Sequence, residues 1–250
     1  MTWDSTDVSA ALDNLQIPAN AVLFVHANAG FLGRPGRGVP AEELAAGMSA
    51  GGRRTIILPA FSYSFGQNVV YDPLQAPRNM GILSDLALAK RWTRSLDPMF
   101  SIWAHGPFAS ELTEIRSPTS FGADSIFRRL VDRDDVYLIT INLGAGSTLV
   151  HEIEHELGVQ YRSTKLFSGD IKIDQRLTTI EWRSYVRDLN DPSTKHDFRR
   201  LTRDLDGKSL RKSIPLGRGV LSSARLQEFR SHIMTEVNLD ARYLTAGGAT

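Results

Sequence analysis

The stretch VYLITINLGAGSTLVHEIEHELGVQYR, residues 136–162, carries the strongest structural signal in the chain. It opens with an apolar run over 136–143 that is bounded by acidic residues and glycine and is short enough to be typical of a buried strand. The Gly-Ala-Gly that follows predicts a tight turn, after which Ser147 or Thr148 can cap a helix. We expect that helix to stop at Gly158. The stretch therefore predicts a strand, a turn and a helix in succession.

The predicted helix carries an unusual concentration of histidine and glutamate. Residues three and four apart share a helix face, so His151, Glu154 and His155 are expected to project together. Glu152 is expected to point elsewhere. This face has two competing chemical interpretations. In a third interpretation, its histidine and glutamate side chains only contact water.

The first interpretation is a zinc hydrolase that uses His151-Glu152-x-x-His155, two histidines one turn apart with a glutamate between them. The longer zinc pattern needs a third histidine where Tyr161 stands, and tyrosine is a poor zinc ligand. A more distant glutamate is the other common third ligand, but Gln175 occupies that position. We therefore expect no metal, and keep the zinc hydrolase as the alternative from a different class.

The second interpretation is metal-free acid–base chemistry. His151 would accept a proton, and Glu154, one turn along, would hold and polarise the imidazole. Thr148 completes the same face. The chain contains no cysteine, which excludes a thiol acyl-enzyme. If an acyl group is transferred, direct attack by an amine on a bound thioester is the simplest course.

Six blocks along the chain resemble, in the same order, those of the aminoglycoside 3-N-acetyltransferase family. The last is Ser147 to Glu154, followed by the pair Tyr161-Arg162, and it is similar to the family's Asn-Thr-x-x-His-x-x-Glu. The other blocks are Val25 to Asn28 with Gly33, Leu58 to Ser62, Tyr71 to Pro73, Met80-Gly81, and Arg94 to Ser101.

The resemblance implies an α/β three-layer sandwich with a mainly parallel central sheet plus a small antiparallel subdomain. It also implies transfer of an acetyl group from acetyl-CoA to an amine, with His151, Glu154 and Thr148 as the catalytic residues. The residues expected to bind the coenzyme are His26, Asn28, Gly33 and Ser101.

Two aspartates are expected to contact the acceptor. Asp72 precedes a proline and could meet a cationic amine or simply form an Asx turn. Asp97 stands where the family has histidine. Together with arginines in the loops 33–37 and 74–79, this departure favours an amino sugar, including one linked to a nucleotide, over an aminoglycoside. The aminoglycoside 3-N-acetyltransferase activity itself is the nearest alternative.

The length suits one large α/β domain, and with the resemblance we expect a single acyltransferase domain over 1–250. An antiparallel insertion is expected at about 163–190. The 250 residues are 42% hydrophobic and 23% charged, with a net charge of +1. This balance is ordinary for a globular enzyme and gives no field that would attract nucleic acid or a membrane. We see no membrane span or signal peptide and expect a cytoplasmic protein. A homodimer is left open.

The C-terminal third is expected to contain a basic helix over 195–205, a strand over 214–220 and a closing helix over 222–237.

Overall fold

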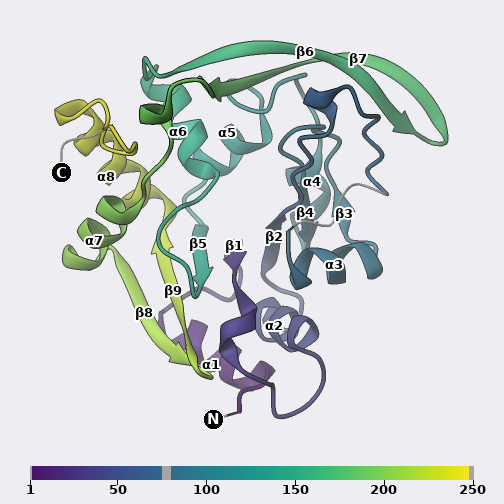
Figure 1. Ribbon diagram of the computed structural model, residues 1–250. Helices are drawn as coiled ribbons and strands as arrows, with labels where there is room; N and C mark the ends of the chain where they lie inside the picture. Colours follow the sequence, from purple (N-terminus) through teal and green to yellow (C-terminus); the bar gives the residue numbers. More distant parts are fainter. Residues whose placement is uncertain (1, 75–79, 248–250) are drawn as a thin grey trace.

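The computed structural model describes residues 2–74 and 80–247, and a seven-stranded sheet crosses its middle (Figure 1). The strand order is β3-β4-β2-β1-β5-β9-β8. The strands are β1 (Val22–Ala27), β2 (Thr55–Pro59), β3 (Thr93–Arg94), β4 (Ile102–His105), β5 (Val136–Ile141), β8 (Arg211–Leu216) and β9 (Gly219–Arg225). The helices are α1 (Ser5–Asn14), α2 (Pro40–Ser49), α3 (Ile82–Ala89), α4 (Ala109–Thr113), α5 (Ile126–Val131), α6 (Leu149–Leu157), α7 (Arg199–Gly207) and α8 (Leu226–Leu239).

The centre of the sheet is parallel. Strand β1 pairs in parallel with β2 on one side and with β5 on the other. Strands β4 and β9 run opposite to the strands beside them, so that β3, β2, β1, β5 and β8 all point the same way. The carboxyl ends of β1 and β5 consequently meet at one edge of the sheet, where His26 lies opposite Thr140. In α/β proteins, ligands bind at this edge.

Each face of the sheet is covered by its own hydrophobic core, which gives the three layers. Alternate residues of β1 enter opposite cores: Phe24 packs on one face, and Leu23 on the other. The Leu23 core includes residues of α1, α2 and α3. The Phe24 core includes residues of α4 to α8.

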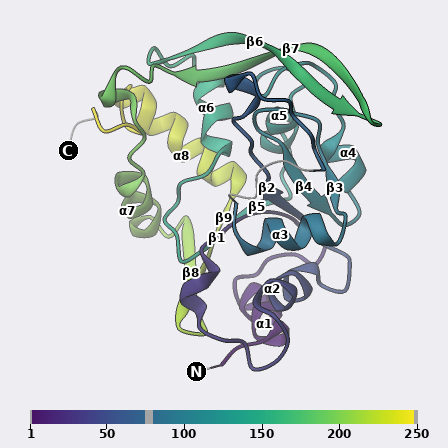
Figure 2. The same ribbon diagram turned by 45° about the vertical axis from the view of Figure 1, so that its right-hand side comes forward.

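A separate two-stranded hairpin, β6 (Arg162–Ile173) with β7 (Arg176–Arg187), arches over α5 and α6 (Figures 1 and 2). Asp174 and Gln175 at its tip have φ values of 48° and 66°, the left-handed pair that a two-residue hairpin turn requires. Gly169 lies inside β6, not in a turn; a Cβ there would come within 2.9 Å of the Phe65 ring. The hairpin occupies the predicted antiparallel insertion.

Two helices begin later than predicted. The expected helix over 195–205 starts at Arg199, and His196 instead forms an isolated bridge with Thr245. The expected helix over 222–237 starts at Leu226, because the residues before it belong to β9 and hydrogen-bond to both β5 and β8. In both places long-range pairing overrides the local helical pattern.

Within residues 2–74 and 80–247, no helix combines the length and the apolar character needed to cross a membrane.

The turn between β5 and α6 depends on Gly146. A Cβ at this position would lie 2.5 Å from Cδ2 of Phe198, just before α7. We predict that Gly146→Ala lowers the free energy of unfolding by about 1–3 kcal/mol, because the Phe198 ring must shift. Gly207→Ala, with nothing within 4 Å of the added methyl, is the control and should be close to neutral. Urea unfolding of the two variants measures this, and equal stability would show that the turn is not tightly packed.

Candidate active site

The carboxylate of Glu154 is fully buried on α6 and surrounded by polar partners. Its Oε2 lies 3.0 Å from Nδ1 of His151 and 2.7 Å from Nε of Arg162. Its Oε1 accepts a hydrogen bond of 2.7 Å from the Tyr161 hydroxyl and lies 2.7 Å from Nε2 of His196. Three segments therefore converge on this group: α6, the start of β6 and the chain before α7.

These partners keep Glu154 ionised. Burial alone would raise the pKa of this carboxyl, but the hydrogen bonds from His151 and His196 and the charge of Arg162 outweigh it. The pKa of Glu154 is therefore held well below its usual range. A carboxylate only accepts hydrogen bonds, so we assign the His151 proton to Nδ1, which leaves Nε2 as a proton acceptor.

His151 stands in an aromatic cage. Phe100 and Phe121 meet its ring edge to face, with centroids 6.0 and 5.7 Å away, and His196 stacks on it at 4.9 Å. Burial lowers the pKa of His151 to about 4, although the hydrogen bond that His151 donates to Glu154 acts to raise it. The imidazole is therefore neutral at physiological pH and available as a base.

The His151 ring opens into a pocket of about 580 Å³ beneath the hairpin. Side chains from both hairpin strands form one wall, and Tyr63, Met99 and Phe100 contribute another. We call this space the hairpin pocket. Its volume is in the range that holds small-molecule ligands.

A second pocket, of about 410 Å³, lies at the carboxyl ends of β1 and β5 and is lined by His26, Asn28, Met80 and Gly81, among others. We call it the edge pocket. Burial lowers the pKa of His26 to about 4, so this ring is also neutral. Nε2 of His26 lies 3.3 Å from Oγ of Ser147, at the residue before the Thr148 N-cap of α6.

Two residues expected to bind the coenzyme lie outside the edge pocket. The carbonyl of Gly33 accepts a hydrogen bond from the Trp3 indole, and a Cβ on Gly33 would meet the Arg218 side chain. Ser101 is fully buried and is hydrogen-bonded to Arg94 and to the carbonyl of Ala60. Both are placed to support loops of the fold.

The two aspartates expected to contact the acceptor have partners within the protein. Oδ1 of Asp97 accepts hydrogen bonds from the amides of Met99 and Phe100 and from Ser120, and only 2% of this residue is exposed. Burial raises the pKa of the Asp97 carboxyl to about 6. This geometry does not fit the expected contact between Asp97 and the acceptor, because the carboxyl is used to stabilise the backbone turn at Met99 and Phe100.

Asp72 forms the Asx turn that the sequence left open, accepting the Leu74 amide at 2.9 Å, and is paired with Lys172 at 3.2 Å. It lines a third pocket, of about 990 Å³, separate from His151. In the loop 33–37, Arg37 pairs with Asp4. The arginine of the loop 74–79 lies outside the described residues.

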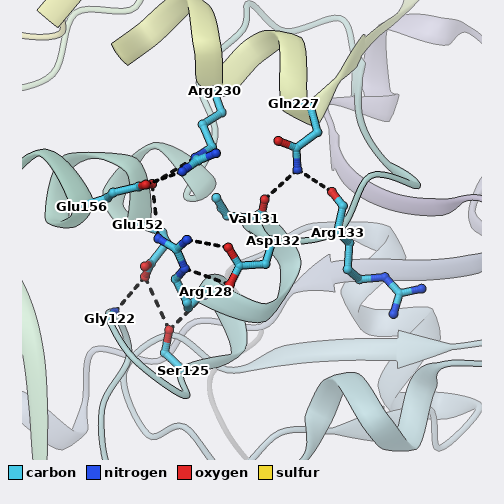
Figure 3. Close-up of polar contacts among 10 residues, drawn as sticks. All are labelled: Gly122, Ser125, Arg128, Val131, Asp132, Arg133, Glu152, Glu156, Gln227 and Arg230. Atoms are coloured by element: carbon cyan, nitrogen blue, oxygen red, sulfur yellow. Dashed lines mark hydrogen bonds and ion pairs between the residues drawn. The ribbon is translucent and has the colours of Figure 1, made fainter. Parts of the chain in front are cut away.

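The zinc interpretation does not fit the helix. As predicted, Glu152 points away from His151: its Oε2 accepts the Gly122 amide at 2.8 Å and lies 3.4 Å from Ser125 Oγ (Figure 3). His155 packs its ring against Tyr185. Over the described ranges, the histidines and carboxylates close enough to hold an ion are His151, Glu154 and His196, a set that excludes His155. The adjacent Arg162 charge opposes a cation there.

Sequence reasoning missed His196. It lies 42 residues from Glu154 along the chain, in a segment whose basic pattern favoured a solvated helix. No local signal separates it from the chain's other histidines. Thr148 was expected on the reactive face and is buried at the N-terminus of α6, beside the link between Ser147 and His26.

Comparison with known proteins identifies a family. A sequence model of the aminoglycoside 3-N-acetyltransferase family matches residues 53–236. No curated protein matches the chain. AAC-IIIb with bound CoASH is 17% identical, with a TM-score of 0.80 over 96% of this chain and 97% of that one. Sisomicin-bound AAC-VIa is 15% identical, with a TM-score of 0.77 over 96% and 99%. YokD from Bacillus subtilis is 15% identical, with a TM-score of 0.75 over 93% and 98%. The predicted fold class is confirmed.

Glu152 provides a test of the buried charges on α6. Burial raises the pKa of this carboxyl to about 7 from its ordinary 4.5. Between those values the folded protein keeps a proton that the unfolded chain has released, so this group lowers the free energy of unfolding as the pH rises through the window. Relative to the wild type, Glu152→Gln should therefore gain on the order of 2 kcal/mol between pH 5 and pH 8, as measured by urea unfolding.

Glu156, four residues along α6, is the matched control. Its contacts with Arg230 and Arg128 lower its pKa below the ordinary 4.5, so this carboxyl is ionised in both the folded and the unfolded state from pH 5 to pH 8 (Figure 3). The difference in stability between Glu156→Gln and the wild type should therefore stay constant across this window. The same pH dependence of this stability difference in both variants would contradict the assignment.

Proposed function

Because the chain belongs to the aminoglycoside 3-N-acetyltransferase family, we propose that it acetylates the amine of an amino sugar, with His151 as the general base. The enzyme is an acyltransferase, and its cosubstrate is acetyl-CoA. The identity of the acceptor and the roles of individual residues are our proposal. The observation that carries it is the neutral His151 ring, oriented by Glu154 and facing the hairpin pocket.

Nε2 of His151 takes the proton that the amine must lose to attack the thioester carbonyl. Glu154 fixes the tautomer and stabilises the imidazolium that forms, which offsets the cost of charging a buried ring. The C–N bond forms, the C–S bond breaks, and the proton held by His151 passes to the departing thiolate, which restores the neutral imidazole. Thr148, at the N-terminus of α6, is proposed to donate a hydrogen bond to the oxyanion or to the departing sulfur.

The edge pocket fits the pantetheine arm of acetyl-CoA. It lies at the edge where β1 and β5 end, is smaller than the hairpin pocket, and is lined mainly by apolar residues together with glycine and serine. Asn28 is exposed there, with no hydrogen bond from its side chain to the helical turn that follows. We propose that His26 and Asn28 contact this arm, and that Gly33 and Ser101 act only by holding their loops.

The hairpin pocket does not suit a polycation. Among the described residues, no aspartate or glutamate lines it, and Glu154 is engaged beneath His151. An aminoglycoside carries several ammonium groups, which such a lining would leave unpaired. We therefore propose an amino sugar with one amine on a hydroxylated ring, a class that includes nucleotide-linked amino sugars, and we propose that the reaction takes place in the cytoplasm.

The first functional test compares two histidines on one helix. We predict that His151→Ala lowers kcat/KM by a hundredfold or more, because the base is lost, whereas His155→Ala changes it less than threefold. Thiol release from acetyl-CoA in the presence of a panel of amino sugars measures both. Equal losses, accompanied by loss of bound zinc in both variants, would show that the helix holds a metal.

The second test concerns acetyl-CoA itself. Calorimetry should show that it binds chelator-treated protein, and that Gly30→Trp, which fills the edge pocket, weakens this binding at least tenfold. The matched control, Gly66→Trp, narrows the hairpin pocket and should leave acetyl-CoA binding unchanged. Binding that appears only after zinc is restored would favour the hydrolase.

A further inference from the structure

The hairpin pocket has an excess of positive charge. Three basic side chains of the hairpin line it: Arg162, Lys165 and Arg187. Arg162 is neutralised, because its Nε lies 2.7 Å from Glu154. The other two have no carboxylate within ion-pairing distance in the described part of the chain. Two uncompensated cations therefore face the same space as the catalytic base.

Arg187 is held in position without being neutralised. It is half-buried at the end of β7, and its Nη1 donates to the Asp188 carbonyl at 3.3 Å and to the Thr194 hydroxyl at 3.5 Å. Its Cα also pairs directly with that of Arg162 across the hairpin. Because Glu154 neutralises Arg162, Arg187 is the member of this pair whose charge has no carboxylate partner among the described residues.

Another cation of the hairpin has a carboxylate partner. Lys172, further along β6, forms an ion pair with Asp72 at 3.2 Å. Arg176 and Arg183 also form no ion pair among the described residues, but they lie outside the hairpin pocket. Lys165 and Arg187 are the unpaired cations that line it, and no carboxylate of the described residues lines it with them. Such an arrangement attracts an anion and repels a polycation.

Resting on the proposed function, we infer that Lys165 and Arg187 form a subsite for an anionic group, a phosphate ester or a carboxylate, on the acceptor whose amine meets His151. The guanidinium can grip two oxygens of such a group, while Lys165 adds a point charge. This subsite replaces the loops 33–37 and 74–79 as the proposed origin of specificity for a phosphorylated or nucleotide-linked sugar.

The experiment measures thiol release with acetyl-CoA and four acceptors: an uncharged hexosamine, its phosphate ester, an amino-hexuronic acid and an aminoglycoside. For the double variant Lys165→Gln/Arg187→Gln, kcat/KM should fall at least tenfold with the anionic acceptor but less than threefold with the uncharged hexosamine. The phosphate and carboxylate arms identify which anion is used. The loss should also shrink as ionic strength rises.

Lys172→Gln and Arg183→Gln, from the same two strands but outside the hairpin pocket, are the controls and should change neither rate. Equal losses on charged and uncharged acceptors, or a wild-type preference for the aminoglycoside, would overturn the subsite while leaving N-acetyl transfer established. Failure of the wild type to release thiol with any amine would overturn the proposed function as well.

Discussion

A single buried carboxylate, that of Glu154, organises the candidate active site of this protein. Taking Glu154 out of water costs several kcal/mol, and that cost is offset only when its oxygens are fully engaged. The groups that engage them come from α6, from the first residues of β6 and from the chain before α7. The same contacts that stabilise the charge therefore fix the hairpin and the C-terminal region against the helix, and they set the orientation of His151.

The part of this arrangement that is local could be predicted from sequence. His151 and Glu154 are three residues apart on a helix, and periodicity alone places them on one face. His196 could not be found this way, because its position depends on a bridge to Thr245 near the far end of the chain. Asp97 shows the converse limit: a pattern reveals a carboxylate, but its burial and its hydrogen bonds to backbone amides depend on the tertiary fold.

The same distinction explains the fold predictions. β1, β2 and β5 are continuous apolar runs because both of their faces are buried, and such runs can be recognised from the sequence alone. The residues before α8 resemble a helix locally, yet they belong to β9 because β5 and β8 lie on either side of them. Sequence identifies elements whose stability is local or whose burial is complete, and misplaces those that depend on distant neighbours.

The two substrates are proposed to meet walls of different origin. The edge pocket is built from the central strands and their loops, whereas one wall of the hairpin pocket belongs to a single excursion of the chain, β6 and β7. Some hairpin residues, such as Trp182 and Tyr185, belong to the core, whereas Lys165 is exposed and lines the pocket without contributing to the sheet or to the cluster around Glu154. Under the proposed function, substitutions at the exposed positions of one β-ribbon would change the accepted amine, while the strands that form the edge pocket and the proposed base stay the same.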